Sequence, residues 1–311
     1  MGLGNSKTKR KAKTTLKKDD SSSSDSSSYD LSSYPKSTCL SPPPPTKPPL
    51  TDTQPNYKLI KDNFETYSDL ELALRKAGLE SSQLIVGIDF TKSNEWQGGK
   101  PYWIFDNLHQ TDSHQLNPYQ QVLSIMCKSL APFDEDQYID AYGFGDEQTR
   151  NKSVFSFQTN SLDDDGDQPC YKLEGVLEKY TEIVKGLTFS GPTSFAPLIR
   201  KAIELVKERK EYHILLIICD VAVNDRKETI SAIVEASKYA LSIVCIGVGK
   251  GPWDVMEEFD DKIPERDFDN FQFVDFYKIM RRCENKEVEF ARHALMEIPD
   301  QYTYIQKFIL N

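Results

Sequence analysis

The sequence lacks the features of a membrane-spanning, secreted or disulfide-stabilised protein. No apolar segment reaches the roughly 18 residues that a bilayer-crossing helix needs, and no apolar stretch follows the N-terminal charges as it would in a signal peptide. The six cysteines never approach C-x-x-C spacing, and several lie inside apolar runs. We therefore expect reduced, mostly buried thiols in a cytosolic protein.

Histidine is scarce, and the four that occur show no spacing typical of a catalytic pair: His109, His114, His213 and His293. The segment that begins at Asp89 also lacks the second aspartate of an aspartyl phosphatase motif. The sequence therefore gives no support for a hydrolase and favours a binding function.

Basic residues are few outside the N-terminus. Residues 1–18 carry seven Lys or Arg and no acid, so the remainder holds 31 bases against 48 acids, a net charge of −17. A body this acidic is not expected to be a general nucleic-acid binder.

Composition divides the chain into three parts. Residues 1–55 contain almost no aliphatic clusters and run through serine-rich and proline-rich stretches, so we expect a disordered tail. Residues 56–298 are numerous enough to bury one substantial core. We expect residues 299–311 to form a C-terminal tail.

The N-terminus carries a lipidation pattern. Its first six residues, MGLGNS, fit N-myristoylation on Gly2, and a polybasic run over 7–18 follows. One acyl chain needs such a second signal for stable attachment to an anionic membrane, so we expect peripheral attachment to the cytoplasmic face of the plasma membrane. The basic run also fits a nuclear import signal or a plain disordered tail, so the nucleus is the alternative location.

Apolar runs alternate with amphipathic segments from residue 68 onward. This alternation predicts an α/β fold with a mostly parallel sheet and helices on both faces. A capping box at Ser68 should open the first helix, Gly78 should end it, and Asn117 should cap another. The last helix is expected over 277–296. The main strands are expected over 84–88, 138–144, 213–219 and 241–248.

Oxygen-bearing side chains follow two of these strands. Asp89, Thr91 and Ser93 end the first strand, and Asp220 ends the strand over 213–219. Strand ends in a parallel sheet meet at one edge, and the turn at Thr193 can close over them. Hard oxygen ligands suit magnesium or manganese, with calcium less favoured. An ion held by two carboxylates and three hydroxyls stays electrophilic toward a carboxylate from another molecule. Taken alone, D-x-T-x-S also fits a simple cap of the next segment.

These motifs resemble the metal-ion-dependent adhesion site of the von Willebrand factor A fold. The strings GIDFTKSN, NPYQQ, AYGFGD, SGPTSF, GVGKGPWD and FDNFQFVDF are similar to the copine family, in particular to plant RING-type ubiquitin ligases that carry a copine domain. The resemblance covers roughly residues 60–298. It implies a divalent metal ligated, directly or through water, by Asp89, Thr91, Ser93, Thr193 and Asp220, and a protein partner that presents an acidic residue.

The sequence departs from that pattern in two places. After Arg282 only Cys283 and His293 could serve a RING, which needs eight closely spaced ligands, so we expect no intrinsic ligase activity. The alternative function is therefore that of a substrate-recruiting subunit or RING-less isoform of the ubiquitin ligase group, working with RING-bearing relatives or the ubiquitin-conjugating machinery. Cys219 and Val221 also flank Asp220 where the family commonly has a small polar residue and a glycine.

Overall fold

The computed structural model describes residues 64–99, 103–134, 136–158, 172–263, 265–282 and 284–310. The predicted tail over 1–55, including Gly2 and its polybasic run, lies outside the described residues. None of the described helices is both long enough and apolar enough to cross a membrane.

Six strands form one sheet in the order β3-β2-β1-β4-β5-β6. Strand β3 pairs antiparallel with β2, and all other neighbours are parallel. Every residue of β4 and β5 is buried, which explains why these strands appear in the sequence as continuous apolar runs. The mostly parallel α/β sheet predicted from the sequence is confirmed. The strands are β1 (Gln83–Asp89), β2 (Ile139–Phe144), β3 (Phe155–Ser156), β4 (His213–Cys219), β5 (Leu241–Gly247) and β6 (Phe271–Asp275).

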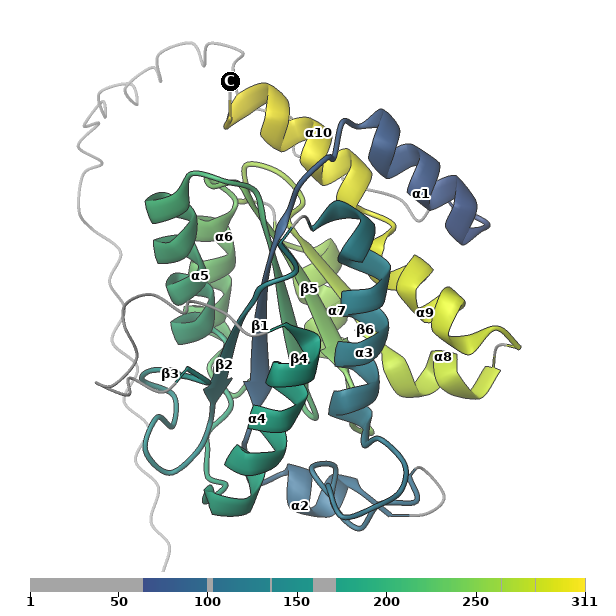
Figure 1. Cartoon of the computed structure of the whole chain (residues 1–311). Coiled ribbons are helices and arrows are strands. Elements are labelled where there is room, and N and C mark those ends of the chain that lie inside the picture. The colour runs from purple at the N-terminus through teal and green to yellow at the C-terminus, as the bar shows by residue number, and fades with distance from the viewer. Residues whose placement is uncertain are drawn as a thin grey trace, which may run out of the picture. The chain divides into compact units, whose positions relative to one another are not determined.

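Helices cover both faces of this sheet (Figure 1). Helices α3 and α4 pack on one face together with α1, α9 and α10, whereas α5, α6 and α7 pack on the other, as right-handed crossovers between parallel strands require. The helices are α1 (Tyr67–Lys76), α2 (Asn94–Gln97), α3 (Pro118–Leu130), α4 (Leu173–Gly186), α5 (Ala196–Arg209), α6 (Arg226–Ala236), α7 (Asp254–Asp261), α8 (Phe276–Arg282), α9 (Lys286–Leu295) and α10 (Ile298–Phe308), and a 3-10 turn, η1, spans Ala131–Phe133.

Two of the three predicted helix boundaries are confirmed. Asn117 caps α3 in a capping box with Gln120, and Gly78 follows α1 with a φ of +82°. The predicted start of α1 at Ser68 is wrong, because Thr66 is the N-cap and its hydroxyl accepts a hydrogen bond from the Asp69 amide. The Thr66 hydroxyl, two residues before Ser68, therefore provides the hydrogen-bond acceptor that the free Asp69 amide in the first turn needs.

The C-terminal region differs from the prediction. The single helix expected over 277–296 is two helices, α8 and α9. The chain then continues into α10, which buries Ile298, Tyr302 and Ile305 in the core. These three residues recur at helical spacing on one face, so the folded domain extends past residue 298 and the expected tail over 299–311 is largely helix.

The strand order reverses beside β1. Strand β2 lies on one side of β1 and β4 on the other, so the chain builds outward in both directions from this pair. The carboxyl ends of β1 and β4 point toward the α2 region at the bottom of Figure 1. In open α/β sheets a reversal of this kind leaves a crevice at the carboxyl edge, where ligands bind.

Candidate metal centre

The five oxygen-bearing residues predicted from the sequence meet at this edge. Thr91 Oγ1 lies 3.0 Å from Ser93 Oγ and 3.4 Å from Thr193 Oγ1. Ser93 Oγ in turn donates to Asp220 Oδ1 at 2.9 Å. The Thr91 amide donates to Asp89 Oδ1 at 2.8 Å, which fixes the first carboxylate against the turn that follows β1. The tertiary structure thus brings together segments separated by more than a hundred residues.

The two carboxylates of this cluster are fully buried, and each keeps one oxygen without a partner. Oδ2 of Asp89 and Oδ2 of Asp220 accept no hydrogen bond, and no basic side chain among the described residues forms an ion pair with either group. Burial raises the pKa of Asp89 to about 7. Burial and the nearby charge of Asp89 raise the pKa of Asp220 well above its usual value. Two desolvated carboxylates of this kind need a cation or protons to balance them.

The available donors fit a hard divalent cation. They are two carboxylates and three hydroxyls, all of them oxygen. Within the described ranges, no three His, Cys, Asp or Glu side chains gather to form a metal cluster. This donor set suits magnesium or manganese better than zinc, which favours nitrogen and sulfur.

The five residues of the cluster differ in their exposure to solvent. Asp89, Thr91, Thr193 and Asp220 are buried, whereas Ser93 is partly exposed. Among these five side chains, Ser93 is therefore the one that solvent reaches most.

A buried polar layer holds the Asp89 turn from beneath. Asn94 Nδ2 donates to the backbone carbonyls of Asp89, at 3.2 Å, and Thr91, at 3.0 Å. The Tyr119 hydroxyl donates to Asn94 Oδ1 at 2.7 Å, which fixes the orientation of that amide. Two further elements therefore determine where the Asp89 turn lies, namely α2, which contains Asn94, and α3, which contains Tyr119.

A second chain of hydrogen bonds reaches the same turn through His109. Its Nε2 lies 2.9 Å from the Asp89 carbonyl oxygen, which only accepts, so Nε2 carries the proton. Its Nδ1 then accepts from the Tyr180 hydroxyl at 2.7 Å, and that hydroxyl accepts from Asn117 Nδ2 at 3.0 Å. Burial lowers the pKa of His109 to about 3, so the ring is neutral.

His109 was not identified as a site residue from the sequence. It precedes α3 in an irregular loop and has no spacing relation to Asp89, so no periodic signal marks it. Asn94 entered the sequence analysis only through the family resemblance and Asn117 also as a helix cap, and nothing in the sequence indicated that either hydrogen-bonds around the site.

The Thr193 turn is anchored to the loop after β4. The Thr193 amide donates to Asn224 Oδ1 at 2.9 Å, and the Asn224 amide donates to the Thr193 carbonyl at 2.9 Å. This reciprocal pair links the turn to the segment that begins at Asp220. The position of Thr193 is therefore coupled to the position of the second carboxylate.

Two glycines allow the loops to approach closely. Gly145 has a φ of +84°, and a Cβ there would lie 2.4 Å from Thr91 Cγ2. A Cβ at Gly249 would lie 1.8 Å from the carbonyl oxygen of Asp220. Any side chain at either position would displace a ligand-bearing loop.

The residue before Asp220 faces the core. Cys219 is fully buried, and its sulfur lies 3.8 Å from the sulfur of Cys245 on the neighbouring strand. This departure from the family pattern is therefore accommodated by packing between β4 and β5.

Comparison with known proteins identifies the family. The copine family description matches residues 107–310. The E3 ubiquitin-protein ligase RGLG5 of Arabidopsis thaliana is 50% identical over 262 residues, which cover 79% of this chain and 59% of the ligase. The E3 ubiquitin-protein ligase RGLG3 of the same plant is 48% identical over 265 residues, which cover 80% of this chain and 70% of the ligase.

A third relative is matched over only a small part of its own length, and a solved structure has low sequence identity to this chain. Copine family protein 2 of Caenorhabditis elegans is 48% identical over 247 residues, which cover 79% of this chain but 3% of that protein. The crystal structure of manganese-loaded TRAP protein from Plasmodium vivax matches with a TM-score of 0.39 and 15% identity, covering 68% of this chain and 74% of the other. The chain thus spans only part of its curated relatives. From the family match and the identity to these relatives, it belongs to the copine family.

Proposed function

We propose that this copine domain is a metal-dependent protein-interaction module that captures an acidic residue of a partner. The observation that carries this proposal is the pair of buried carboxylates, Asp89 and Asp220, each with an unpartnered oxygen beside three hydroxyls. Asp89, Thr91, Ser93, Thr193 and Asp220 would hold a magnesium or manganese ion. When bound, the ion supplies positive charge and a coordination position for a carboxylate.

Metal binding is tested first, by calorimetric titration of the full chain with Mn²⁺. We expect Asp89→Ala to abolish binding, because it removes one of the two charged ligands. Asp106→Ala is the matched control, since Asp106 is an exposed aspartate in the loop after α2. Equal Mn²⁺ affinity in wild type and Asp89→Ala would exclude this set of ligands.

Partner capture is tested separately, with the full chain immobilised in Mg²⁺. We expect proteins that bind wild type to be released by chelator and to be absent with Asp89→Ala, while the thermal unfolding of Asp89→Ala shows a folded domain. The same proteins retained in chelator would show that binding does not use the metal.

We further propose that the module is held at the cytoplasmic face of the plasma membrane through acylated Gly2 and the basic run over 7–18. The pattern MGLGNS and the seven basic residues that follow it over 7–18 support this location. Gly2→Ala should move the protein out of the membrane fraction, whereas Gly4→Ala should leave it there. Because the basic run also fits nuclear import, imaging of Gly2→Ala distinguishes cytosolic release from nuclear accumulation. An unchanged membrane fraction in Gly2→Ala would exclude acylation as the anchor.

A second role, in protein ubiquitination, is supported by the identity to E3 ubiquitin-protein ligases. We propose that the domain recruits substrates, working with RING-bearing relatives or ubiquitin-conjugating enzymes. Proteins captured in a metal-dependent manner should then show reduced ubiquitination in cells that express Asp89→Ala in place of wild type. Unchanged ubiquitination of those proteins would separate capture from the ligase pathway.

A further inference from the structure

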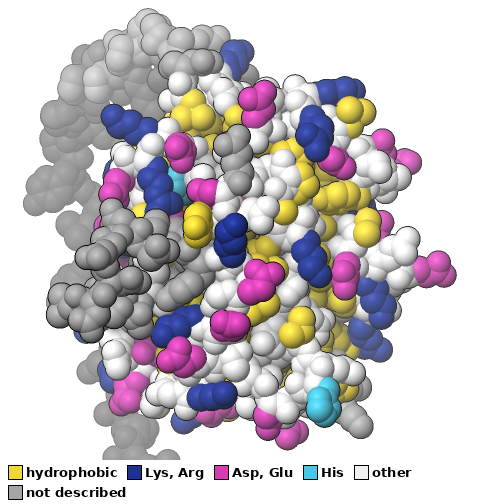
Figure 2. Space-filling model, viewed as in Figure 1, with side chains coloured by type: hydrophobic (Ala, Val, Ile, Leu, Met, Phe, Trp, Pro, Cys, Tyr) yellow, Lys and Arg dark blue, Asp and Glu magenta, His cyan; other side chains and the backbone are white. Residues whose placement is uncertain are grey.

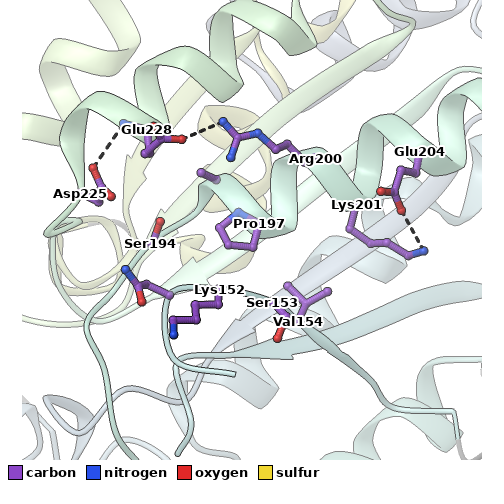
Figure 3. A pocket seen from close by; sticks show the side chains of 12 residues that line it. Lys152, Ser153, Val154, Ser194, Pro197, Arg200, Lys201, Glu204, Asp225 and Glu228 are labelled. Atoms are coloured by element: carbon purple, nitrogen blue, oxygen red, sulfur yellow. Dashed lines mark hydrogen bonds and ion pairs between the residues drawn. The ribbon is translucent and has the colours of Figure 1, made fainter. Parts of the chain in front are cut away.

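A cleft of about 460 Å³ is lined in part by Ser194, the residue that follows Thr193 of the candidate metal centre. Its walls come from the segment between β2 and β3, from the start of α5 and from the start of α6 (Figure 3). In that view Ser194 and Pro197 lie between Lys152, on the β2–β3 side, and the acidic side chains at the start of α6. Residues next to the metal centre therefore also line the cleft.

Ser194 connects the two sites. It follows Thr193 directly, so their Cα atoms are about 3.8 Å apart. The Thr193 hydroxyl faces Thr91 in the metal centre, whereas Ser194 lines the cleft. Ser194 is 3% exposed, and its hydroxyl has no hydrogen-bond partner among the described residues. A hydroxyl at the wall of a cleft that makes no hydrogen bond to a described residue is available as a donor to a ligand.

Most of the charged groups in the cleft are already engaged with one another. Arg200 forms an ion pair with Glu228 at 2.8 Å, and Lys201 forms one with Glu204 at 3.2 Å. The carboxylate of Asp225 caps α6 by accepting from the Glu228 amide at 3.3 Å. Glu228 and Glu204 are therefore each paired with a cation, whereas Asp225 accepts from the start of α6, so the lining carries three acids and three cations.

The remaining positive charge belongs to Lys152 and to the start of α5. Lys152 forms an ion pair with no acidic side chain in the described part of the chain. Helix α5 begins without a side-chain cap, so amides of its first turn are left as donors at the positive end of the helix. Together with the Ser194 hydroxyl, these groups form a local set of one cation and hydrogen-bond donors that suits an anion.

The cleft lies on a protein body that is acidic overall. The chain outside its first 18 residues carries a net charge of −17. On the face shown in Figure 2, acidic and basic side chains are interspersed and no broad basic area is visible. An acidic partner is repelled by such a body at long range, so its binding depends on positive groups within a Debye length, about 8–10 Å.

From this geometry we propose that the cleft binds a second carboxylate of the same partner segment whose first carboxylate occupies the metal centre. The inference rests on the proposed function, because the first carboxylate anchors the segment. An extended chain advances about 3.3–3.6 Å per residue, so the second acid lies a few residues from the first. The domain therefore recognises a segment with two spaced acids and not a single acidic side chain.

Fluorescence anisotropy with labelled Gly/Ser peptides tests this inference on the full chain in Mg²⁺. One peptide carries a single Asp, and a series carries a second Asp two, three, four or five residues away, with Asn at the same position as the uncharged control. For at least one spacing we expect the second Asp to tighten binding about fivefold, as one partly exposed charge pair does.

Variants locate the source of that gain. Lys152→Ala should remove the gain and leave the affinity for the single-Asp peptide unchanged, and Ser194→Ala should reduce it. Lys76→Ala, an exposed lysine on α1, is the control and should retain it. No gain at any spacing, or a gain that persists in Lys152→Ala, overturns the inference while the metal-dependent binding of the single-Asp peptide still supports the proposed function. Loss of binding by all peptides in Mg²⁺ overturns both.

Discussion

Ser93 Oγ donates a hydrogen bond of 2.9 Å to Asp220 Oδ1, joining two loops that are 127 residues apart in the chain. This contact bridges the ends of β1 and β4 at the point where the strand order reverses. Oδ2 of Asp220 has no hydrogen-bond partner, and neither has Oδ2 of Asp89. The cluster is therefore arranged for a ligand but is electrostatically uncompensated without one, and this has measurable consequences.

The first consequence is a pH-dependent stability of the metal-free protein. The pKa of Asp89 is raised from 3.8 to about 7, so the folded state binds its proton more tightly than the unfolded state does. This contribution to the free energy of unfolding is fully present below about pH 4 and is lost as the pH rises through 7. Mg²⁺ or Mn²⁺ should restore stability at pH 8.

Other groups contribute to the same curve, so a variant is needed to isolate Asp89. Burial raises the pKa of Asp134 to about 6, which acts in the same direction, whereas the lowered pKa of His109 acts in the opposite direction. Urea unfolding at pH 5 and pH 8 in chelator should therefore be compared between wild type and Asp89→Asn. We expect the variant to lose less stability between these pH values, by about 1–4 kcal/mol. Identical losses would contradict the prediction.

The second prediction concerns the hydrogen bonds beneath the site. Tyr180→Phe removes the hydroxyl that donates to His109 Nδ1 and accepts from Asn117. His109 Nδ1 then lacks a partner and Asn117 Nδ2 keeps only its hydrogen bond to the Gln110 carbonyl, so we expect a loss of about 1–3 kcal/mol in the free energy of unfolding. Tyr138→Phe, at an exposed tyrosine, should change it by less than about 0.5 kcal/mol. Equal effects of the two substitutions would show that the buried chain of hydrogen bonds does not contribute.

The third prediction separates backbone strain from steric collision. Gly145 and Gly78 both have positive φ, but only a Cβ at Gly145 meets another atom, Cγ2 of Thr91. Both Gly→Ala variants should lose about 1–2 kcal/mol of stability from the left-handed backbone. Gly145→Ala should in addition weaken Mn²⁺ binding at least tenfold, because it displaces the Thr91 loop. Calorimetry of both variants checks this, and unchanged Mn²⁺ affinity in Gly145→Ala would contradict it.

The fourth prediction concerns the anchoring of the Thr193 turn. Asn224→Ala removes the side-chain oxygen that accepts from the Thr193 amide, while Asn224 itself is exposed. We therefore expect a small loss of stability, below about 1 kcal/mol, but a weaker metal affinity because Thr193 is no longer fixed. Asn151→Ala, in the neighbouring segment before β3, is the control. Equal Mn²⁺ affinity in the two variants would exclude this anchoring role.

Much of the fold and five side chains of the candidate site could be predicted from the sequence. Continuous apolar runs such as 84–88 predict buried parallel strands, because such strands are covered on both faces. The position of Asp89 and Asp220 directly after two of these runs predicts that they share an edge, since parallel strands all end on the same side. The hard oxygen donors also predict a divalent cation, and the burial of both carboxylates in the structure adds a second reason for one.

Other features were decided only by tertiary packing. The role of His109 depends on contacts from Tyr180 and Asp89, which are 71 and 20 residues away, and no local pattern encodes such distances. Residues 299–308 form a helix because the core buries Tyr302 and Ile305. Thr193 faces the metal centre while Ser194 lines the cleft. This arrangement arises because the turn between α4 and α5 lies against loops that follow two strands. Periodicity and strand ends report local burial, whereas orientation of single side chains is set by long-range contacts.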